Sequence, residues 1–445
     1  MEIETKTDPK ETILPLLEGS TWPGAAEAFG AVNSIPVPGR KSEAWKYTRV
    51  SGLFDRPYSR PQKDPSIDLP QRLKFDVTRV VFVNGHFHAD LSDDLKALGK
   101  GIVADTLKDH LSHGPVQKHY GRLATVKQGE DRTANDRLFT AMNTASPTDG
   151  LIILVTKGQK LAKPIHILHV ITEDKVLIQP RDLFMLHEEA EAEVIVEVVT
   201  GGEVVDNTSR AESRDGDVSR SLINSVRESV IGEGARLTIH LLQNSANAPT
   251  MIGLDQVEVN AKGNFSIDTT TLEGGLIRND LAVSLAGPEA HAELNGIYLI
   301  DGSTHCDNHT YIGHDTPDCT SDELYKGIIA GKATGVFNGK VYVRQDAQRT
   351  RAYQSNANIL QGDDAKVYTK PELEIYADDV KCSHGCTIGR LDEKGLFYLR
   401  SRGVSEAEAR KMLAHAFASD VLDRVQNEDW REHLMTLIDR KLAAL

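Results

Sequence analysis

From residue 149 to about residue 400, the chain consists mainly of short runs of Val, Ile, Leu and Thr that end at Gly, Asn, Asp or Pro. Examples are DGLIILVTKGQKLAKPIHILHV at 149–170, VIVEVVTGGEVV at 194–205 and RLTIHLLQN at 236–244. Runs of this length and composition are typical of β-strands. Because no convincing helix of ten residues interrupts them, the pattern favours a mainly β fold over alternating α/β.

A loose internal repeat narrows the choice of β architecture. The segments TSDELYKGIIA (320–330), RTRAYQSNANIL (349–360) and VKCSHGCTIG (380–389) recur every 29–31 residues. The runs GVFNGKVYV, AKVYTKPELEIYA and LFYL (396–399) follow them as further predicted strands. Two strands per period predict a β-helix or solenoid, whose stacked coils bury the apolar face that one coil cannot bury alone. Because the repeat is imperfect, a β-sandwich remains the alternative.

The region before this repeat is mixed. We expect residues 1–145 to be a mainly helical region with a short β-hairpin at 77–87, since Asn84-Gly85 is a strong signal for a tight turn between strands. The predicted β-helix core then covers residues 146–400.

The end of the chain has helical spacing of apolar residues. Ser405 and Glu408 form a capping box, and a second helix is expected to start near Asn427. These signals predict a C-terminal helical subdomain at 401–445. Its first helix is predicted to expose a charged side with the residues Arg410, Lys411, Asp420 and Arg424.

Composition and charge exclude some functional classes. The chain has 445 residues, with 51 Lys and Arg against 65 Asp and Glu, and a formal net charge of −14. An acidic chain binds nucleic acid and anionic membranes poorly, and no run of 18 apolar residues could span a bilayer. We therefore expect no nucleic-acid partner and no membrane association.

The first residues and the cysteines indicate the cellular compartment in which the protein works. The opening MEIETKTDPKETILPLLEG has early acids and no basic-then-apolar signal pattern. Four cysteines in so long a chain do not make a disulfide framework, and they suit a reducing compartment. We therefore expect a cytoplasmic protein.

The most informative segment for chemistry is residues 376–404. Cys382, His384 and Cys386 lie two residues apart, so on a strand all three point to one face. Two thiols and an imidazole are soft ligands that suit iron–sulfur species, Zn or Cu(I). Alternatively, this face of the strand could lie in the protein core. Val380 and Ile388 would point to the same face, and free cysteines are often buried.

A second group of potential ligands lies at HCDNHTYIGHDTPDC (305–319). It could supply a zinc site, but its strand-like middle places neighbouring side chains on alternating faces, which weakens a compact site. The potential ligands are His305, Cys306, His309, His314 and Cys319.

Other catalytic classes lack their signatures. The sequence contains no G-x-x-x-x-G-K-[ST] or G-x-G-x-x-G motif and no recognisable triad around its cysteines. The acidic doublets Asp363-Asp364 and Asp378-Asp379 are the only hint of a carbohydrate-active β-helix, and such doublets at turns are usually solvated.

Several segments resemble the SufB/SufD family of Fe–S cluster assembly proteins. They are SEAWKYTRV (42–50), FTAMNTA (139–145), HDTPDCTSDELYKGII, and CSHG followed by LFYLRSRG. The resemblance implies a right-handed parallel β-helix core and treats the 305–319 segment chiefly as scaffold. Leu399 stands where SufB proteins have a cysteine that is thought to hold the nascent cluster, so the chain is similar to the SufD type.

The resemblance also implies ligands. His384 matches the histidine that SufD-type chains place near the SufB cysteine, and Cys382 is its plausible neighbour. His384 is therefore the expected metal ligand, with Cys382, for a transient Fe–S cluster shared with SufB. No tightly bound cofactor is expected in the isolated chain, and flavin binding is left open. Cys386 falls where the family often has Ala, so we expect it to serve packing.

The implied role is a non-enzymatic scaffold subunit of a SufBCD complex. It would pair with SufB through the end of the β-helix around 365–400 and dock the SufC ATPase through the C-terminal helices. Homodimers could form when SufB is absent. The alternative is a stand-alone metal-binding or carbohydrate-active β-helix protein.

Overall fold

The computed structural model describes residues 9–39, 41–63, 67, 69–125, 137–201, 220–245 and 249–444. Residues 1–8, which open the segment searched for a signal pattern, lie outside them. In the described part of the chain, no helix is both long and apolar enough to cross a bilayer.

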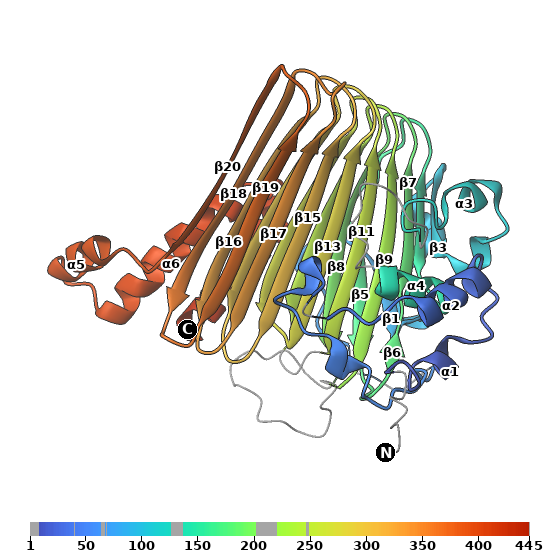
Figure 1. Ribbon diagram of the computed structural model, residues 1–445, viewed down its shortest axis with the longest axis horizontal. Coiled ribbons are helices and arrows are strands. Elements are labelled where there is room, and N and C mark those ends of the chain that lie inside the picture. Colours follow the sequence, from blue (N-terminus) through green and yellow to red (C-terminus); the bar gives the residue numbers. More distant parts are fainter. Residues whose placement is uncertain are drawn as a thin grey trace, which may run out of the picture.

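Two long sheets of mainly parallel strands form the body of the molecule (Figure 1). The first sheet contains, in spatial order, β2 (His86–Phe87), β1 (Thr78–Val83), β5 (Ile165–Ile171), β8 (Glu191–Thr200), β10 (Arg236–Asn244), β12 (Asn264–Glu273), β14 (His291–Ile300), β16 (Thr320–Ala330), β18 (Thr350–Gln361) and β20 (Val380–Gly389). The second contains β19 (Lys366–Ile375), β17 (Thr334–Val343), β15 (His305–His314), β13 (Leu276–Leu285), β11 (Thr250–Val259), β9 (Leu222–Ile231), β7 (Arg181–Leu186), β4 (Leu151–Val155) and β3 (Ile102–Thr106), with β6 (Leu177–Ile178) beside β9.

The chain alternates between the two sheets from β8 onward, so each pair of strands makes one coil of a parallel β-helix. Coils stack in register: His291 pairs with Thr320, 29 residues later, and Glu323 pairs with Gln354, 31 residues later. The sequence repeat of 29–31 residues therefore corresponds to one coil. The prediction of a mainly β, parallel β-helix fold with helices at both ends is confirmed, and the β-sandwich alternative is wrong.

The main core lies between the two sheets. Strand side chains alternate between the interior and the outer face, and the interior positions are apolar over most of the length. Leu294 of the first sheet and Val341 and Val343 of the second are fully buried there. Stacking the coils buries this interior continuously, which is why many short apolar runs make one stable body.

The N-terminal region supplies strands as well as helices. β1 pairs with β5 and β3 pairs with β4, so this region contributes strands to both sheets. The predicted hairpin is confirmed: Val83 pairs with His86 across Asn84 and Gly85, which have positive φ angles of 49° and 82°. The α-helices of this region are α1 (Leu14–Leu17), α2 (Ala25–Ser34), α3 (Gly114–His119) and α4 (Arg137–Ala145).

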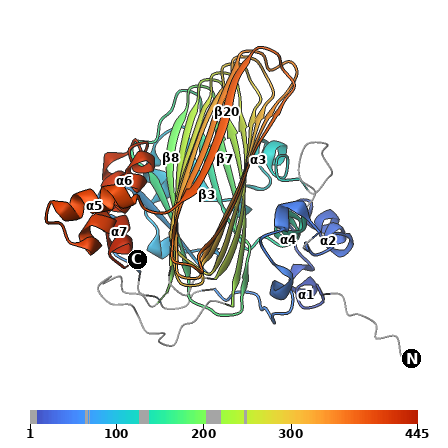
Figure 2. The same cartoon turned by 60° about the vertical axis from the view of Figure 1, so that its left-hand side comes forward.

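The N-terminal and C-terminal helices lie on opposite sides of the β-helix (Figure 2). α4 packs on β9 of the second sheet, and α2 packs on α4. Short 3₁₀ helices connect the N-terminal elements: η1 (Glu43–Trp45), η2 (Ser51–Leu53), η3 (Ala89–Leu91), η4 (Leu95–Leu98) and η5 (Lys108–His110).

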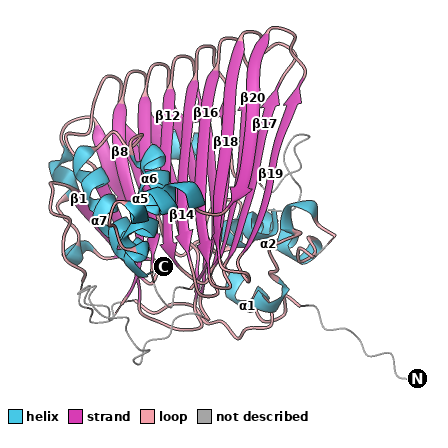
Figure 3. Ribbon diagram, turned by 90° about the vertical axis from the view of Figure 1, so that its left-hand side faces the viewer, coloured by secondary structure: helices cyan, strands magenta, loops and turns pink. Residues whose placement is uncertain are grey.

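The C-terminal helices α5 (Glu393–Ser401), α6 (Glu406–Leu422) and α7 (Glu428–Ala444) lie along the first sheet (Figure 3). α6 contacts β14 and β16, and α7 contacts β14. The predicted cap is confirmed, because the Ser405 hydroxyl accepts a hydrogen bond from the Glu408 amide at 3.2 Å. Trp430 is buried in the apolar layer between these helices and the sheet.

The strand predicted for LFYL at 396–399 is wrong. These residues belong to α5, which begins after Asp392, whose carboxylate accepts the Lys394 amide hydrogen bond at 3.0 Å. The physical reason is local, because Asp392 is a good N-cap. β20 is consequently the last strand of the chain's described part.

A buried histidine beneath the C-terminal helices gives the stability of the fold a pH dependence. Burial opposes the charge on His240, but an ion pair with Asp268 at 2.9 Å and a hydrogen-bonded ion pair with Glu193 at 3.0 Å outweigh it and raise its pKa to about 9. A raised pKa contributes stability that is complete below the unfolded-state pKa of about 6.5 and is lost as the pH rises through about 9.

We therefore expect the wild type to lose its stability advantage over His240→Gln between pH 6.5 and pH 9. The loss should be at most about 3 kcal/mol, at about 1.4 kcal/mol per pKa unit. Urea unfolding of both proteins across this range checks it. An advantage that stays constant with pH would contradict the pairing.

Candidate functional site

The β-helix is open at its C-terminal end. β19 and β20 are the last strands of their sheets, and each has a strand partner on one side only among the described residues. At the opposite end, Phe87, Leu95 and Leu98 pack against the interior core. One end of the interior is therefore plugged by apolar side chains, while the other is bounded only by the last coil.

His384 and Cys382 lie on this last coil. Cys382 is in register with Ala352, and His384 with Gln354. Since Ala352 and Gln354 are buried in the interior, residues at the same register positions of β20 face the same side. Because no further coil covers them, His384 is exposed, while Cys382 is half-buried against the core.

The thiols of this strand differ in their surroundings. Burial raises the pKa of the Cys382 thiol, which disfavours the free thiolate until a metal or a cation stabilises it. Cys386 is exposed. Among the described residues no strand lies above β20, so a packing role for Cys386 would need a partner and stays a prediction.

The open end offers an incomplete set of metal ligands. Cys382 and His384 are two residues apart on one strand, about 7 Å, and they supply a soft sulfur and an imidazole nitrogen. Within the described ranges, no group of three or more His, Cys, Asp or Glu residues is arranged to hold a metal ion. A metal centre here would therefore need further ligands from another molecule.

The second group of potential ligands does not converge. Cys306 and His314 point into the interior of the β-helix, where burial raises the pKa of the Cys306 thiol to about 12 and lowers that of His314 to about 4. Cys319 is buried with its thiol 3.3 Å from the Gly287 carbonyl. His305 and His309 instead lie on the outer face, beside the N-terminal segment.

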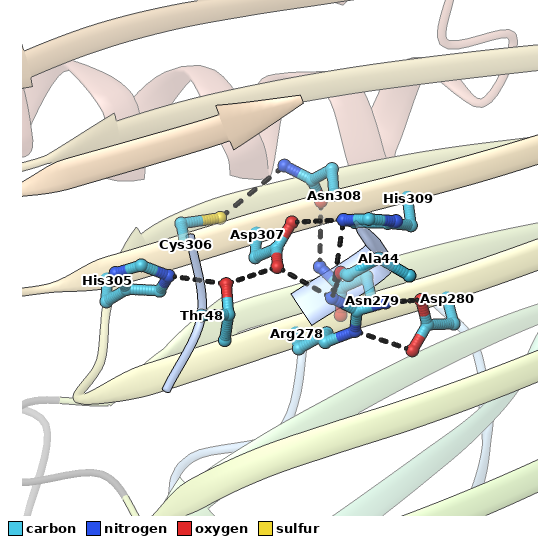
Figure 4. Close-up of polar contacts among 10 residues, drawn as sticks. All are labelled: Ala44, Thr48, Arg278, Asn279, Asp280, His305, Cys306, Asp307, Asn308 and His309. Atoms are coloured by element: carbon cyan, nitrogen blue, oxygen red, sulfur yellow. Dashed lines mark hydrogen bonds and ion pairs between the residues drawn. The ribbon is translucent and has the colours of Figure 1, made fainter. Parts of the chain in front are cut away.

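The outer-face residues form a polar network (Figure 4). Asp307 accepts hydrogen bonds from the Arg278 guanidinium at 2.9 Å and from the Thr48 hydroxyl, and His309 lies 3.0 Å from its other oxygen. Burial alone would raise the pKa of Asp307, but His309 and Arg278 hold it well below its usual range. Asp307 is therefore a buried, ionised anchor.

This network fixes the segment SEAWKYT to the outer face of the second sheet. The Arg278 guanidinium donates to the Ala44 carbonyl at 2.6 Å and lies 3.8 Å from the centre of the Trp45 ring, a favourable cation–π contact. Asp280 holds the other side of the guanidinium at 2.7 and 2.8 Å. The spacing of Trp45 and Thr48 in the sequence is explained by these contacts.

Sequence reasoning missed Arg278 and Asp280. The signal that could have found them is RND at 278–280, a pair of opposite charges placed two residues apart within an apolar run that reads as a buried strand. Such charges are rarely buried unless they are paired.

The helical subdomain carries a second exposed surface. Phe397 and Tyr398 of α5 are 76% and 55% exposed, and Met412 of α6 is 44% exposed. We call these three residues the helical apolar patch. They lie on two helices that pack on each other, and exposed apolar patches are typical of docking sites.

The prediction that one side of α6 is free and charged is wrong in part. Asp420 pairs with Lys326 of β16, and Arg424 pairs with Asp322 of β16. These two residues hold α6 to the β-helix instead of facing a partner. Arg410 lies on the exposed side, where it pairs with Glu406 at 2.9 Å.

The fold and site together define a class of protein: a parallel β-helix with one plugged end, one open end that bears a thiol and an exposed imidazole, and a helical subdomain alongside. The family described as "SUF system FeS cluster assembly, SufBD core domain" matches residues 169–417, and the "SufBD protein N-terminal region" matches residues 24–167. The chain therefore belongs to the SufBD family, which takes part in Fe–S cluster assembly.

Relatives from several bacteria resemble the chain over most of its length. An iron-sulfur cluster assembly SufBD family protein of Synechocystis sp. is 30% identical, with 90% of this chain and 86% of the relative covered. The iron-sulfur cluster assembly protein SufD of Escherichia coli is 28% identical, with 91% and 89% covered. SufD of Bacillus subtilis is 23% identical, with 80% and 77% covered. The expected family membership is confirmed.

The Asp307 network makes a prediction about folding. Asp307→Asn removes the charge that pairs with the buried Arg278, so we expect a loss of roughly 3 kcal/mol in the free energy of unfolding and faster proteolysis near Trp45. Urea unfolding and limited proteolysis check this. The control is Glu43→Gln, whose ion pair with Lys370 is exposed and should contribute less than about 1 kcal/mol. Equal effects of the two substitutions would contradict the assigned anchor.

Proposed function

We propose that this chain is a non-enzymatic scaffold subunit of the SufD type, which supports Fe–S cluster assembly together with a SufB partner and a SufC ATPase in the cytoplasm. The observation that carries the proposal is the position of His384. Its imidazole is exposed on β20, the last strand of the first sheet, which is paired with β18 on one side only, and Cys382 lies two residues away on the same strand. A second polypeptide can reach it there.

The open edge suits pairing with another β-helix. A terminal strand presents unpaired backbone N–H and C=O groups, which are a template for strand addition. Ile375, Tyr376 and Ile388 add exposed apolar area at the same end, at 38%, 58% and 51% exposure. Burying this area against a partner would favour association. A second copy of the chain could occupy the edge when SufB is absent.

A shared site accounts for the incomplete ligand set. Neutral imidazole and thiolate both bind iron, but one residue of each kind from one chain binds it weakly. A cluster would therefore assemble only where SufB completes the ligands, and it could leave when the interface is rearranged. In this scheme the cluster is cargo, and Leu399 is consistent with the principal sulfur-receiving thiol belonging to SufB.

The helical apolar patch is the proposed docking surface for SufC. It lies on α5 and α6, away from the residues that attach α6 to the β-helix. An ATPase bound there would be only one short turn, residues 390–392, from the end of β20. Movement of the helices could thus be transmitted to the strand that bears His384.

The alternative, a stand-alone metal-binding or carbohydrate-active protein, has less support. The potential ligands at 305–319 lie on different faces of β15 and serve packing or the N-terminal anchor. Arg390 pairs with Asp363 at an exposed turn, which is an ordinary surface contact. No observation favours a sugar groove.

His384→Ala tests the cluster role. In cells that depend on this pathway, we expect the variant to assemble with SufB and SufC but to lose most activity of Fe–S enzymes, because an iron ligand is missing. Complementation and co-purification measure the two properties. Ser383→Ala, an exposed neighbour on the other face of β20, is the control and should behave as wild type. Full activity of His384→Ala would remove this residue from the mechanism.

A double substitution of the helical apolar patch, Phe397→Ala with Tyr398→Ala, tests docking. Aromatic residues at the centre of an interface contribute about 2 kcal/mol or more each, so affinity for SufC should fall by at least about 30-fold. Titration by calorimetry with purified SufC measures it. Met435→Ala on α7, where Met435 is 36% exposed, is the matched control. Unchanged affinity of the double variant would place the SufC contact elsewhere.

A further inference from the structure

A column of polar side chains runs inward from His384. On the first sheet, His384 is in register with Gln354, and Gln354 with Glu323. Gln354 and Glu323 are 3% and 1% exposed, inside the β-helix. One position deeper, the column ends at Leu294. Two polar residues thus lie directly behind the exposed histidine, in a part of the interior that also contains the buried carboxamides of Asn356 and Asn358.

The side-chain amide of Gln354 has a hydrogen-bond partner for its nitrogen but, among the described residues, none for its oxygen. Its Nε2 group donates a hydrogen bond to Glu323 Oε2 at 2.6 Å. Its Oε1 atom has no hydrogen-bond partner among the described residues. A buried amide oxygen without a hydrogen-bond partner is unfavourable, so we expect a group to donate a hydrogen bond to it in the working complex. His384 occupies the next register position on the same side.

The facing sheet leaves room for this amide. Gly339 of β17 lies across the interior, and a Cβ atom there would come within 2.4 Å of Gln354 Nε2 and 2.7 Å of the Phe337 ring. A side chain at this position would push the carboxamide out of place. Gly339 therefore leaves the space that the Gln354 carboxamide occupies while it donates its hydrogen bond to Glu323.

Metal-bound histidines usually donate their second ring N–H to a protein acceptor, which fixes the tautomer and orientation of the ring. We propose that Gln354 is the positioning residue for His384, accepting its N–H through Oε1 when a SufB partner covers the last coil. Glu323 anchors Gln354 in turn. This inference rests on the proposed function, since it assigns a supporting partner to the histidine of that site.

Glu323 can anchor the amide as a neutral acid. Burial raises the pKa of its carboxyl to about 7, and the nearby Thr310 hydroxyl and the hydrogen bond from Gln354 oppose that shift only partly. A carboxylic acid still accepts an N–H through its carbonyl oxygen. Glu323→Gln keeps such an acceptor, so it should preserve the hydrogen bonds that link residue 323 through Gln354 to His384. Glu323→Leu removes the acceptor and should break them.

The test uses the full chain in complex with SufB and SufC, with an Fe–S cluster reconstituted from iron and sulfide and reduced to a paramagnetic state. Pulsed electron paramagnetic resonance then reports the nitrogen bound to iron and the quadrupole coupling of the remote ring nitrogen, which responds to its hydrogen bond. In Gln354→Leu, we expect the iron-bound nitrogen to remain, the remote coupling to change, and the cluster to be lost to a chelator at least about 10-fold faster.

Matched variants separate positioning from general damage. Asn358→Leu removes another buried carboxamide from β18, at the position in register with Ile388, and it should leave the remote coupling unchanged. Glu323→Gln should resemble wild type, and Glu323→Leu should resemble Gln354→Leu. If Gln354→Leu does not fold, Gly339→Ala displaces the same amide from the opposite sheet and should change the coupling in the same way.

The outcomes are distinguishable. If His384→Ala retains the nitrogen signal, the proposed function fails. If that signal is lost in His384→Ala, but Gln354→Leu keeps the wild-type remote coupling and cluster lifetime, the assignment of Gln354 is overturned and His384 keeps its role. The assignment is also overturned if Asn358→Leu reproduces the effects of Gln354→Leu.

Discussion

The structure depends on one constraint: each coil of the β-helix must stack in register on another. A coil satisfies its backbone hydrogen bonds through its neighbours and buries its inward side chains against theirs. A chain of finite length therefore has two end coils, each with backbone groups and inward side chains on one side that no further coil covers. Whether an end coil is covered by other parts of the chain decides whether that end can bind a partner.

The two ends are treated differently. At the N-terminal end, the chain turns back into the antiparallel strands β2 and β3, and apolar side chains such as Phe87 pack against the core. At the C-terminal end, β19 and β20 stop without such a cover, and the helices that follow lie along the side of the first sheet. This asymmetry, together with His384 at the uncovered end, suits a subunit that is completed by a partner.

Much of this could be predicted from the sequence. Alternation and a period of about 30 residues predicted a β-helix or solenoid with a β-sandwich as the alternative, because both are local properties of every coil, and the family resemblance indicated the parallel β-helix. The same alternation placed Cys382 and His384 on one face of a strand. Periodicity failed at 396–399, where Asp392 caps a helix, since a four-residue apolar run fits either structure.

The remaining features are tertiary and had no local signal strong enough to find them. The anchor joins Asp307 to Thr48 and Arg278 to Ala44, and the residues of each pair are more than two hundred positions apart. No local signal in SEAWKYTRV identifies Arg278 as the cation that packs on the Trp45 ring. Asp420 and Arg424 were read as a free helix side because their partners on β16 lie about a hundred residues earlier.

Backbone hydrogen exchange at the open end tests the central claim most directly. Amides of β19 and β20 should exchange quickly along the outer edge in the isolated chain and become strongly protected when SufB is added, while the amides of β14 at the centre of the first sheet stay unchanged. Exchange at β20 that is indifferent to SufB, with protection appearing elsewhere on the chain, would contradict the account.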